Sequence, residues 1–172
     1  MQAALEQEYV DFVTARIPAL RRLAYSLCGD AHRGDDLVQQ AITRLYTHWR
    51  RARTATSLDA YARTTLVRTY LDERRLAWAR RVTLSPSVPD QPAPDGVDLD
   101  DRVLLRAALE KVPPRQRAVL VLRFVHDLPV EEVAEILRCS SGTVKSQTSH
   151  GLAALRRALG PQALLALGKE RQ

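Results

Sequence analysis

A polar stretch near the end of the chain has the residue types that best suit contact with nucleic acid. Residues 141–150 contain one aliphatic side chain, Val144, and no acidic residue. Short hydroxyl groups and a lysine at the start of a helix can hydrogen-bond to base edges and phosphates in a major groove. The polar side chains expected on the outer face are Ser141, Thr143, Lys145, Ser146, Thr148 and Ser149.

The segment before this stretch supplies a helix that would hold it in place. The i, i+3, i+4, i+7 spacing of an amphipathic helix is present in Val130, Val133, Ala134 and Leu137. A turn is expected at 138–140, so the pattern predicts a helix-turn-helix over about 130–150 and DNA binding. A plain helical hairpin is the alternative, but its second helix would normally carry more apolar residues or Glu–Lys pairs.

Charge is distributed unevenly along the 172 residues, whose formal net charge is +6. Residues 1–82 carry 14 basic and 9 acidic side chains, and residues 102–172 carry 12 basic and 6 acidic. Between them, residues 83–101 carry five aspartates and no basic residue. Two basic segments joined by a short acidic segment favour a polyanionic partner. Candidate phosphate contacts, with solvated helix faces as the alternative, are Arg123, Arg156 and Arg157.

Proline marks the boundary between the two basic segments. Residues 84–100 contain four prolines and one glycine among serines and aspartates, and no helix runs through that density of proline. We therefore predict a flexible, acidic, Pro-rich linker over 83–100. It joins a domain at 5–82 to a second domain at 101–160, and a C-terminal tail follows at 161–172.

Every other apolar pattern is helical, so the sequence predicts an all-α fold of two small domains. The first domain should contain a stripe through Val13, a helix that Pro18 opens and Gly29 ends, a helix at about 34–51, and a helix that Ser57 caps. In the second domain, a short helix should end at Pro113-Pro114. The next helix starts at about Pro114, and its apolar residues, including Phe124 and Val125, are expected in the core.

Nothing in the chain has the spacing of a catalytic or metal site, so we expect no enzyme activity, no cofactor and no metal. The two cysteines, Cys28 and Cys139, and the four histidines show no metal-ligand pattern. No apolar run approaches the length of a membrane span, and the N-terminus lacks a signal pattern. A cytoplasmic location is the expectation.

Several motifs in a fixed order give the chain a family resemblance. In the first domain they are Asp36-Leu-Val-Gln-Gln-Ala41, Trp49, Leu58-Asp-Ala-Tyr61, Arg68-Thr-Tyr-Leu-Asp72 and Arg74-Arg75. In the second they are Leu109, Pro113-Pro-Arg-Gln-Arg117, Leu122-Arg-Phe124, Glu131-Glu-Val-Ala134 and Gly142-Thr-Val-Lys-Ser-Gln147. Over about residues 5–160 the chain resembles bacterial RNA polymerase sigma factors of the sigma-70 family. Within that family it is similar to the extracytoplasmic-function (ECF) group and its actinobacterial SigE-like branch.

The resemblance implies a function and a set of residues for each domain. The first domain would be region 2, which binds core RNA polymerase and the −10 element; the second would be region 4, which binds the −35 element. The implied −35 contacts are Ser141, Thr143, Val144, Lys145, Ser146, Thr148 and Ser149, with Arg123 and Arg156. The implied core-polymerase contacts are Asp36, Leu37, Val38, Gln39, Gln40, Ile42 and Thr43.

The resemblance also implies that the loop at 50–57 and the helix after it capture a flipped base of the −10 element. The implied −10 residues are Arg51, Arg53, Thr54, Thr56, Tyr61, Arg63, Thr64, Arg68, Arg74 and Arg75. Arg68 departs from the family pattern, since most relatives have asparagine there, and we expect an altered −10 preference. His150 and Leu152 stand where many relatives have arginine, which should weaken phosphate anchoring.

The implied partners are promoter DNA, the clamp helices of the largest polymerase subunit and the flap of the second subunit, together with an anti-sigma factor in many relatives. A free-standing helix-turn-helix regulator that acts without polymerase is the alternative. It would be expected to bind a palindrome as a dimer, and no dimer seam or ligand pocket is evident in the sequence.

Overall fold

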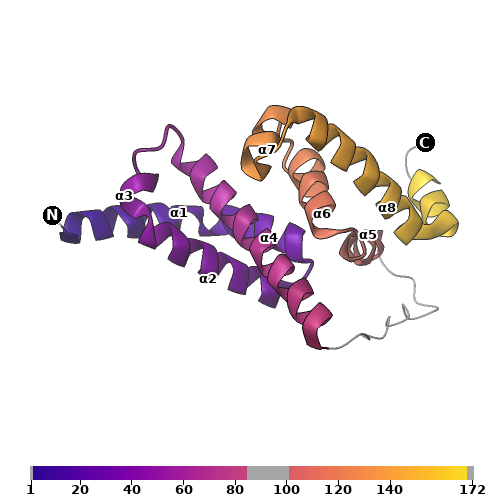
Figure 1. The fold of residues 1–172 in the computed structure, drawn as a ribbon, viewed down its shortest axis with the longest axis horizontal. Helices are drawn as coiled ribbons and strands as arrows, with labels where there is room; N and C mark the ends of the chain where they lie inside the picture. Colours follow the sequence, from indigo (N-terminus) through magenta and orange to yellow (C-terminus); the bar gives the residue numbers. More distant parts are fainter. Residues whose placement is uncertain (1, 85–100, 170–172) are drawn as a thin grey trace.

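The computed structural model describes the backbone of residues 2–84 and 101–169, and the side chains of all of these except 84 and 162–169. Within those ranges all regular structure is helical, which confirms the all-α prediction (Figure 1). The N-terminal bundle comprises α1 Gln2–Cys28, α2 Ala31–Thr47, α3 Trp49–Ala52 and α4 Leu58–Leu84. The C-terminal bundle comprises α5 Asp101–Glu110, α6 Pro114–Leu120, the π-helical turn η1 Val121–Val125, α7 Val130–Leu137 and α8 Ser141–Lys169. Most of the predicted linker, residues 85–100, lies outside the described residues.

The first helix is longer than predicted, because α1 continues through Pro18 instead of starting again there. Proline removes one backbone donor and usually kinks a helix. Here Pro18 lies on the exposed side, while Val13 before it and Leu20 after it are both buried in the core. Packing on both flanks therefore holds one helix together across the proline.

Local capping signals fix the starts of α2 and α4. The side chain of Asp30 accepts a hydrogen bond from the backbone N–H of Arg33 at 3.0 Å, so α2 begins three residues earlier than the predicted Gly34. That bond lowers the pKa of the Asp30 carboxyl. The Ser57 hydroxyl accepts from the N–H of Ala60 at 3.2 Å, which confirms the predicted cap of α4.

In the C-terminal bundle, α7, a short turn and α8 form the predicted helix-turn-helix. The chain leaves α7 through Arg138, whose φ of 51° places it in the left-handed region. The Ser140 hydroxyl then accepts from the N–H of Thr143 at 3.1 Å and caps α8. Gly160, with φ 72° and ψ 166°, breaks α8 at the predicted boundary between the second domain and the C-terminal tail.

The two bundles pack against each other through α4, which lies between α1 and α2 on one side and α6 and α7 on the other (Figure 1). One continuous hydrophobic core runs from the N-terminal bundle, including Leu66, into the C-terminal bundle, including Val119 and Val133. The prediction that Phe124 and Val125 belong to the core is wrong: both are 56% exposed, because the π-helical turn η1 rotates them outward.

Candidate nucleic-acid interfaces and the contact between the bundles

The start of α8 presents a polar face to solvent. Lys145, Ser146 and Ser149 are exposed, and Ser141, Thr143 and Thr148 are partly exposed. Val144 faces the opposite way and is fully buried, with 0% relative exposure. The prediction that Val144 contacts DNA is therefore corrected: its side chain anchors the helix to the core, which fixes the direction in which its polar neighbours point.

Two hydroxyl groups on this face also serve the helix itself. Thr148 Oγ1 donates to the carbonyl of Val144 at 2.7 Å, and Thr143 Oγ1 lies 2.9 Å from the Ser140 hydroxyl. Arg156 is exposed further along α8. Arg123 instead donates through Nη1 to the carbonyl of Leu128 at 2.7 Å, so it closes the loop before α7. Of the three arginines predicted to contact phosphate, Arg156 and Arg157 are exposed to solvent.

The loop between α3 and α4 is exposed, as a nucleic-acid contact requires. Arg51, Arg53, Thr54 and Thr56 all have exposed side chains. Arg53 forms a two-atom ion pair with Glu8 of α1, with contacts of 3.1 and 2.9 Å. The pair ties the loop to α1. Arg51, in the neighbouring helix α3, is exposed and lines the cavity beside the loop.

That cavity has a volume of about 380 Å³ and lies between the loop, α4 and α7. Its N-terminal wall contains residues predicted to capture the −10 base, namely Arg51, Tyr61, Thr64 and Arg68. Its opposite wall consists of Glu132, Glu135 and Ile136 of α7 and of Arg138, directly after that helix. The structure therefore gathers several predicted −10 residues into one concave site, but α7 closes one side of it.

Arginines of α4 make direct bonds to α7. Arg63 Nη1 forms an ion pair with Glu132 Oε1. Arg68 donates through Nε to the carbonyl of Ile136 at 3.1 Å and through Nη2 to the carbonyl of Glu135 at 3.3 Å. Burial lowers the pKa of the Arg68 guanidinium, with Arg138 nearby as a second cause.

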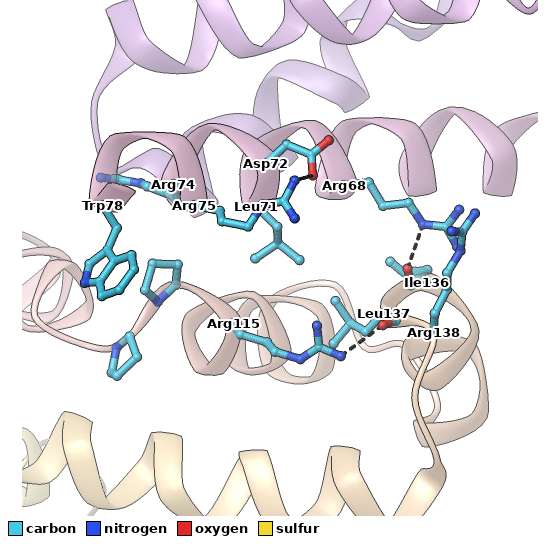
Figure 2. Close-up of a pocket in the computed structure, with 12 residues that line it drawn as sticks. Arg68, Leu71, Asp72, Arg74, Arg75, Trp78, Arg115, Ile136, Leu137 and Arg138 are labelled. Carbon is cyan, nitrogen blue, oxygen red and sulfur yellow. Dashed lines mark hydrogen bonds and ion pairs between the residues drawn. The ribbon is translucent and has the colours of Figure 1, made fainter. Parts of the chain in front are cut away.

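A second cavity, of about 650 Å³, lies on the other side of Arg68 (Figure 2). Five arginines surround it, with Leu71 and Trp78 from α4 and with Pro113 and Pro114 at the start of α6. Figure 2 shows Arg115 reaching the carbonyl of Leu137, at 2.9 Å. The predicted −10 residues Arg74 and Arg75 lie here too. Arg74 stands over the Tyr70 ring, 5.6 Å from its centroid, and Arg75 is 3.9 Å from Asp72.

Sequence reasoning missed Arg117 of α6, which is only 2% exposed. Burial lowers the pKa of its guanidinium, and Tyr70 partly offsets that effect. Its Nε and Nη2 atoms are buried without a hydrogen-bond partner among the described residues. The only sequence signal for this position is its place in the run 113–117, since a charged residue on an amphipathic helix normally predicts exposure.

The polar face predicted to bind core polymerase is present on α2. Asp36, Gln39, Gln40 and Thr43 are exposed. Ile42 is half-buried, and its carbonyl accepts a 2.8 Å hydrogen bond from the Tyr9 hydroxyl. Leu37 and Val38 have relative exposures of 0% and 3%, so the prediction that their side chains contact polymerase is corrected: they pack inside the bundle.

Within the described ranges, 2–84 and 101–169, no group of three or more His, Cys, Asp or Glu side chains is placed to hold a metal ion. In the same residues, no helix has both the length and the apolar character needed to cross a membrane.

Comparison with known proteins links these surfaces to a family. The family model described as "Sigma-70 region 2" matches residues 12–80, and the model described as "Sigma-70, region 4" matches residues 102–155. An RNA polymerase sigma-E factor of Streptomyces coelicolor is 35% identical over 170 residues, which are 96% of this chain and 93% of that one. The ECF RNA polymerase sigma factor SigL of Mycobacterium tuberculosis is 33% identical over 142 residues, 80% of each chain.

A solved structure extends the likeness to three dimensions. The sigma factor RpoE of Bartonella quintana, in complex with the anti-sigma factor NepR, matches with a TM-score of 0.66 and 25% identity. The match covers 89% of this chain and 97% of that one. These findings confirm the resemblance and remove the alternative of a free-standing regulator. The chain belongs to the sigma-70 family, in its ECF group, and is a non-catalytic RNA polymerase sigma factor whose regions 2 and 4 serve promoter recognition.

Proposed function

We propose that α8 reads the −35 element as duplex DNA and that the segment 50–57, with α4, captures a base of the −10 element. The observation that carries the −35 assignment is the fully buried Val144 between exposed polar neighbours, because it fixes which face of α8 is available. Support for the −10 assignment is the cavity that brings Arg51, Tyr61 and Thr64 together. A pocket of this kind offsets the few kcal/mol that unstacking a base costs.

The −35 assignment is tested by selecting DNA with the holoenzyme and then measuring variants on the selected promoter. Lys145→Ala should weaken promoter binding and reduce the slope of log affinity against log salt by about one ion. Arg80→Ala is the matched control, because Arg80 is an exposed cation at the far end of α4. An equal loss of affinity in both variants would contradict the assignment.

We assign core-polymerase binding to the exposed face of α2, with the clamp helices of the largest subunit as its partner. Asp36→Arg should reduce association with core polymerase, while leaving the fold intact because the side chain is exposed. Glu6→Arg makes the same charge change at an exposed position of α1 and should leave association unchanged. A gel-shift or light-scattering titration with purified core polymerase measures both.

Further partners follow from the family. The exposed Phe124 and Val125 are an apolar pair on region 4 that fits the flap of the second polymerase subunit. An anti-sigma factor is a further proposed partner, by analogy with the solved relative, which is bound to one. The proposed compartment is the cytoplasm, where core polymerase works. Phe124→Ser should weaken holoenzyme activity at promoters that depend on the −35 element.

A further inference from the structure

The α4 residues assigned above to the −10 element are already occupied by region 4 of the same chain. Arg63 pairs with Glu132 of α7, and the two side chains retain only 29% and 33% of their exposure. Dissolved salt screens a partly buried ion pair less than it screens a pair that is fully exposed to water. Glu132 therefore takes up a cation that a DNA phosphate would otherwise meet.

Arg68 binds α7 in a different way, through backbone carbonyls at the end of the helix. The last carbonyls of a helix have no partner within it and carry partial negative charge. Arg68 donates to two of them, on Glu135 and Ile136, while Arg115 donates to the carbonyl of Leu137 (Figure 2). An asparagine side chain is too short to span the same gap with two donors, so this contact requires the length and the forked donors of arginine.

The same contact changes the cavity proposed to hold the flipped base. Glu132 and Glu135 of α7 line it opposite Arg51 and Arg68. A DNA strand entering there would bring its phosphates against two carboxylates in a partly desolvated space, which is unfavourable. The strand can use this surface only after α7 has moved away.

Two features make the contact suited to opening. Arg117 is buried between the bundles with two nitrogen atoms that lack partners among the described residues, which costs free energy that hydration would recover. The polar face of α8 stays exposed in the packed state. Packing of the bundles therefore covers the −10 surface, meaning the α4 residues assigned to the −10 element, and leaves the −35 surface, meaning the polar face of α8, open to DNA.

We propose that the −10 surface of region 2 also docks α7 of region 4, so that promoter DNA and region 4 compete for Arg63 and Arg68. This inference rests on the proposed −10 role of these arginines. In the free chain, the docked state keeps region 2 from binding single-stranded DNA. Core polymerase, by holding the regions apart, removes that block.

The test uses the full chain and two variants of α7 that lose the same charge. Glu132→Gln breaks the pair with Arg63, whereas Glu131→Gln alters the neighbouring, exposed glutamate. Small-angle scattering gives the radius of gyration of each free chain. Fluorescence anisotropy gives the affinity for a labelled random-sequence single strand of about 16 nucleotides.

Glu132→Gln should enlarge the radius of gyration and tighten single-strand binding by roughly 3- to 5-fold relative to Glu131→Gln, the factor that such an ion pair contributes. Equal results for the two variants, or expansion without tighter binding, would overturn the competition. Transcription by the holoenzyme separates this failure from failure of the proposed function. Expansion and tighter binding with no initiation at any promoter would refute the proposed function and leave the docking in place. Normal initiation by the holoenzyme, with an unchanged radius of gyration and an unchanged affinity for the single strand, would refute the docking and leave the proposed function in place.

Discussion

Gly29 leaves the space that the side chain of Arg117 fills between the two bundles. A Cβ atom at Gly29 would lie 3.0 Å from Nη2 of Arg117 and 3.0 Å from Oε1 of Glu110. Gly29 also ends α1 with a φ of +70°, a conformation that glycine adopts without strain. Arg106 covers the same end of α1, with its guanidinium 4.4 Å from the centroid of the Tyr25 ring. One residue thus serves both the end of a helix and the approach of region 4.

Gly29→Ala should therefore do more than strain α1. The left-handed conformation alone costs an alanine about 1–2 kcal/mol. The added methyl group would also press on the ends of the Arg117 and Glu110 side chains, both from region 4, which must shift to make room for it. We expect a lower free energy of unfolding in urea together with a larger radius of gyration.

Gly160→Ala is the matched control for that substitution. Gly160 has a φ of +72°, and nothing lies within 4 Å of the position of its Cβ. Gly160→Ala should lower the free energy of unfolding through backbone strain and leave the radius of gyration unchanged. If both variants expand the chain equally, Gly29 has no special role in the contact between the bundles.

The contact should also weaken as the pH falls through the ordinary range of histidine. Burial lowers the pKa of His126, and the cations Arg63 and Arg22 lower it further, against a smaller opposing effect of Asp127. His126 lines a cavity of about 280 Å³ with Arg16 and Asp59 also in its wall, so opening the bundles exposes the ring to water.

The lowered pKa of His126 determines whether the packed state gains or loses stability as the pH falls. A histidine whose folded pKa lies below its ordinary value of about 6.5 takes up more protons when exposed, so the packed state is most stable above that pH. The packed state loses stability as the pH falls below it. The radius of gyration should rise between neutral and mildly acidic pH. His126→Gln should remove that dependence and His150→Gln, at an exposed position, should retain it.

Val144 should matter for stability and Ser146 for binding, although they lie two residues apart on α8. Val144→Ala removes two buried carbons and leaves a cavity, at a cost of about 2–3 kcal/mol. Ser146→Ala alters an exposed side chain and should change stability by no more than about 0.5 kcal/mol. Urea denaturation measures the first effect, and promoter binding of the folded variants measures the second. A large stability loss from Ser146→Ala would show that the helix faces are assigned wrongly.

Features set by neighbouring residues could be predicted from the sequence, and features set by tertiary contact could not. The cap at Ser57, the start of α6 at Pro114 and the helix-turn-helix are local, and they were found where expected. The prediction that a helix begins at Pro18 was wrong, because packing on either side outweighs the lost backbone hydrogen bond. The prediction that Phe124 lies in the core was wrong, because a π-helical turn changes which residues face inward.

The candidate site shows the same division. The family resemblance implied that the basic side chains of α4 contact the −10 element, and that role stays a proposal. Their observed partners include backbone carbonyls of α7, which every residue possesses and which no residue type can reveal. The buried Arg117 was equally hidden, because its burial arises only when the two bundles meet.

Arg68→Asn should loosen the contact between the bundles by shortening the side chain that reaches α7. The variant loses two hydrogen bonds to the C-terminal carbonyls of α7, which together stabilise the packed state by about 1–2 kcal/mol. We expect a larger radius of gyration and faster amide hydrogen exchange in the last turn of α7. Arg75→Asn removes the same charge from α4 at an exposed position paired with Asp72 of the same helix, and it should leave both quantities unchanged. If the two variants expand the chain alike, the loss of positive charge on α4 is the cause and the bond to the helix end is not. If neither does, Arg68 does not hold region 4 against region 2.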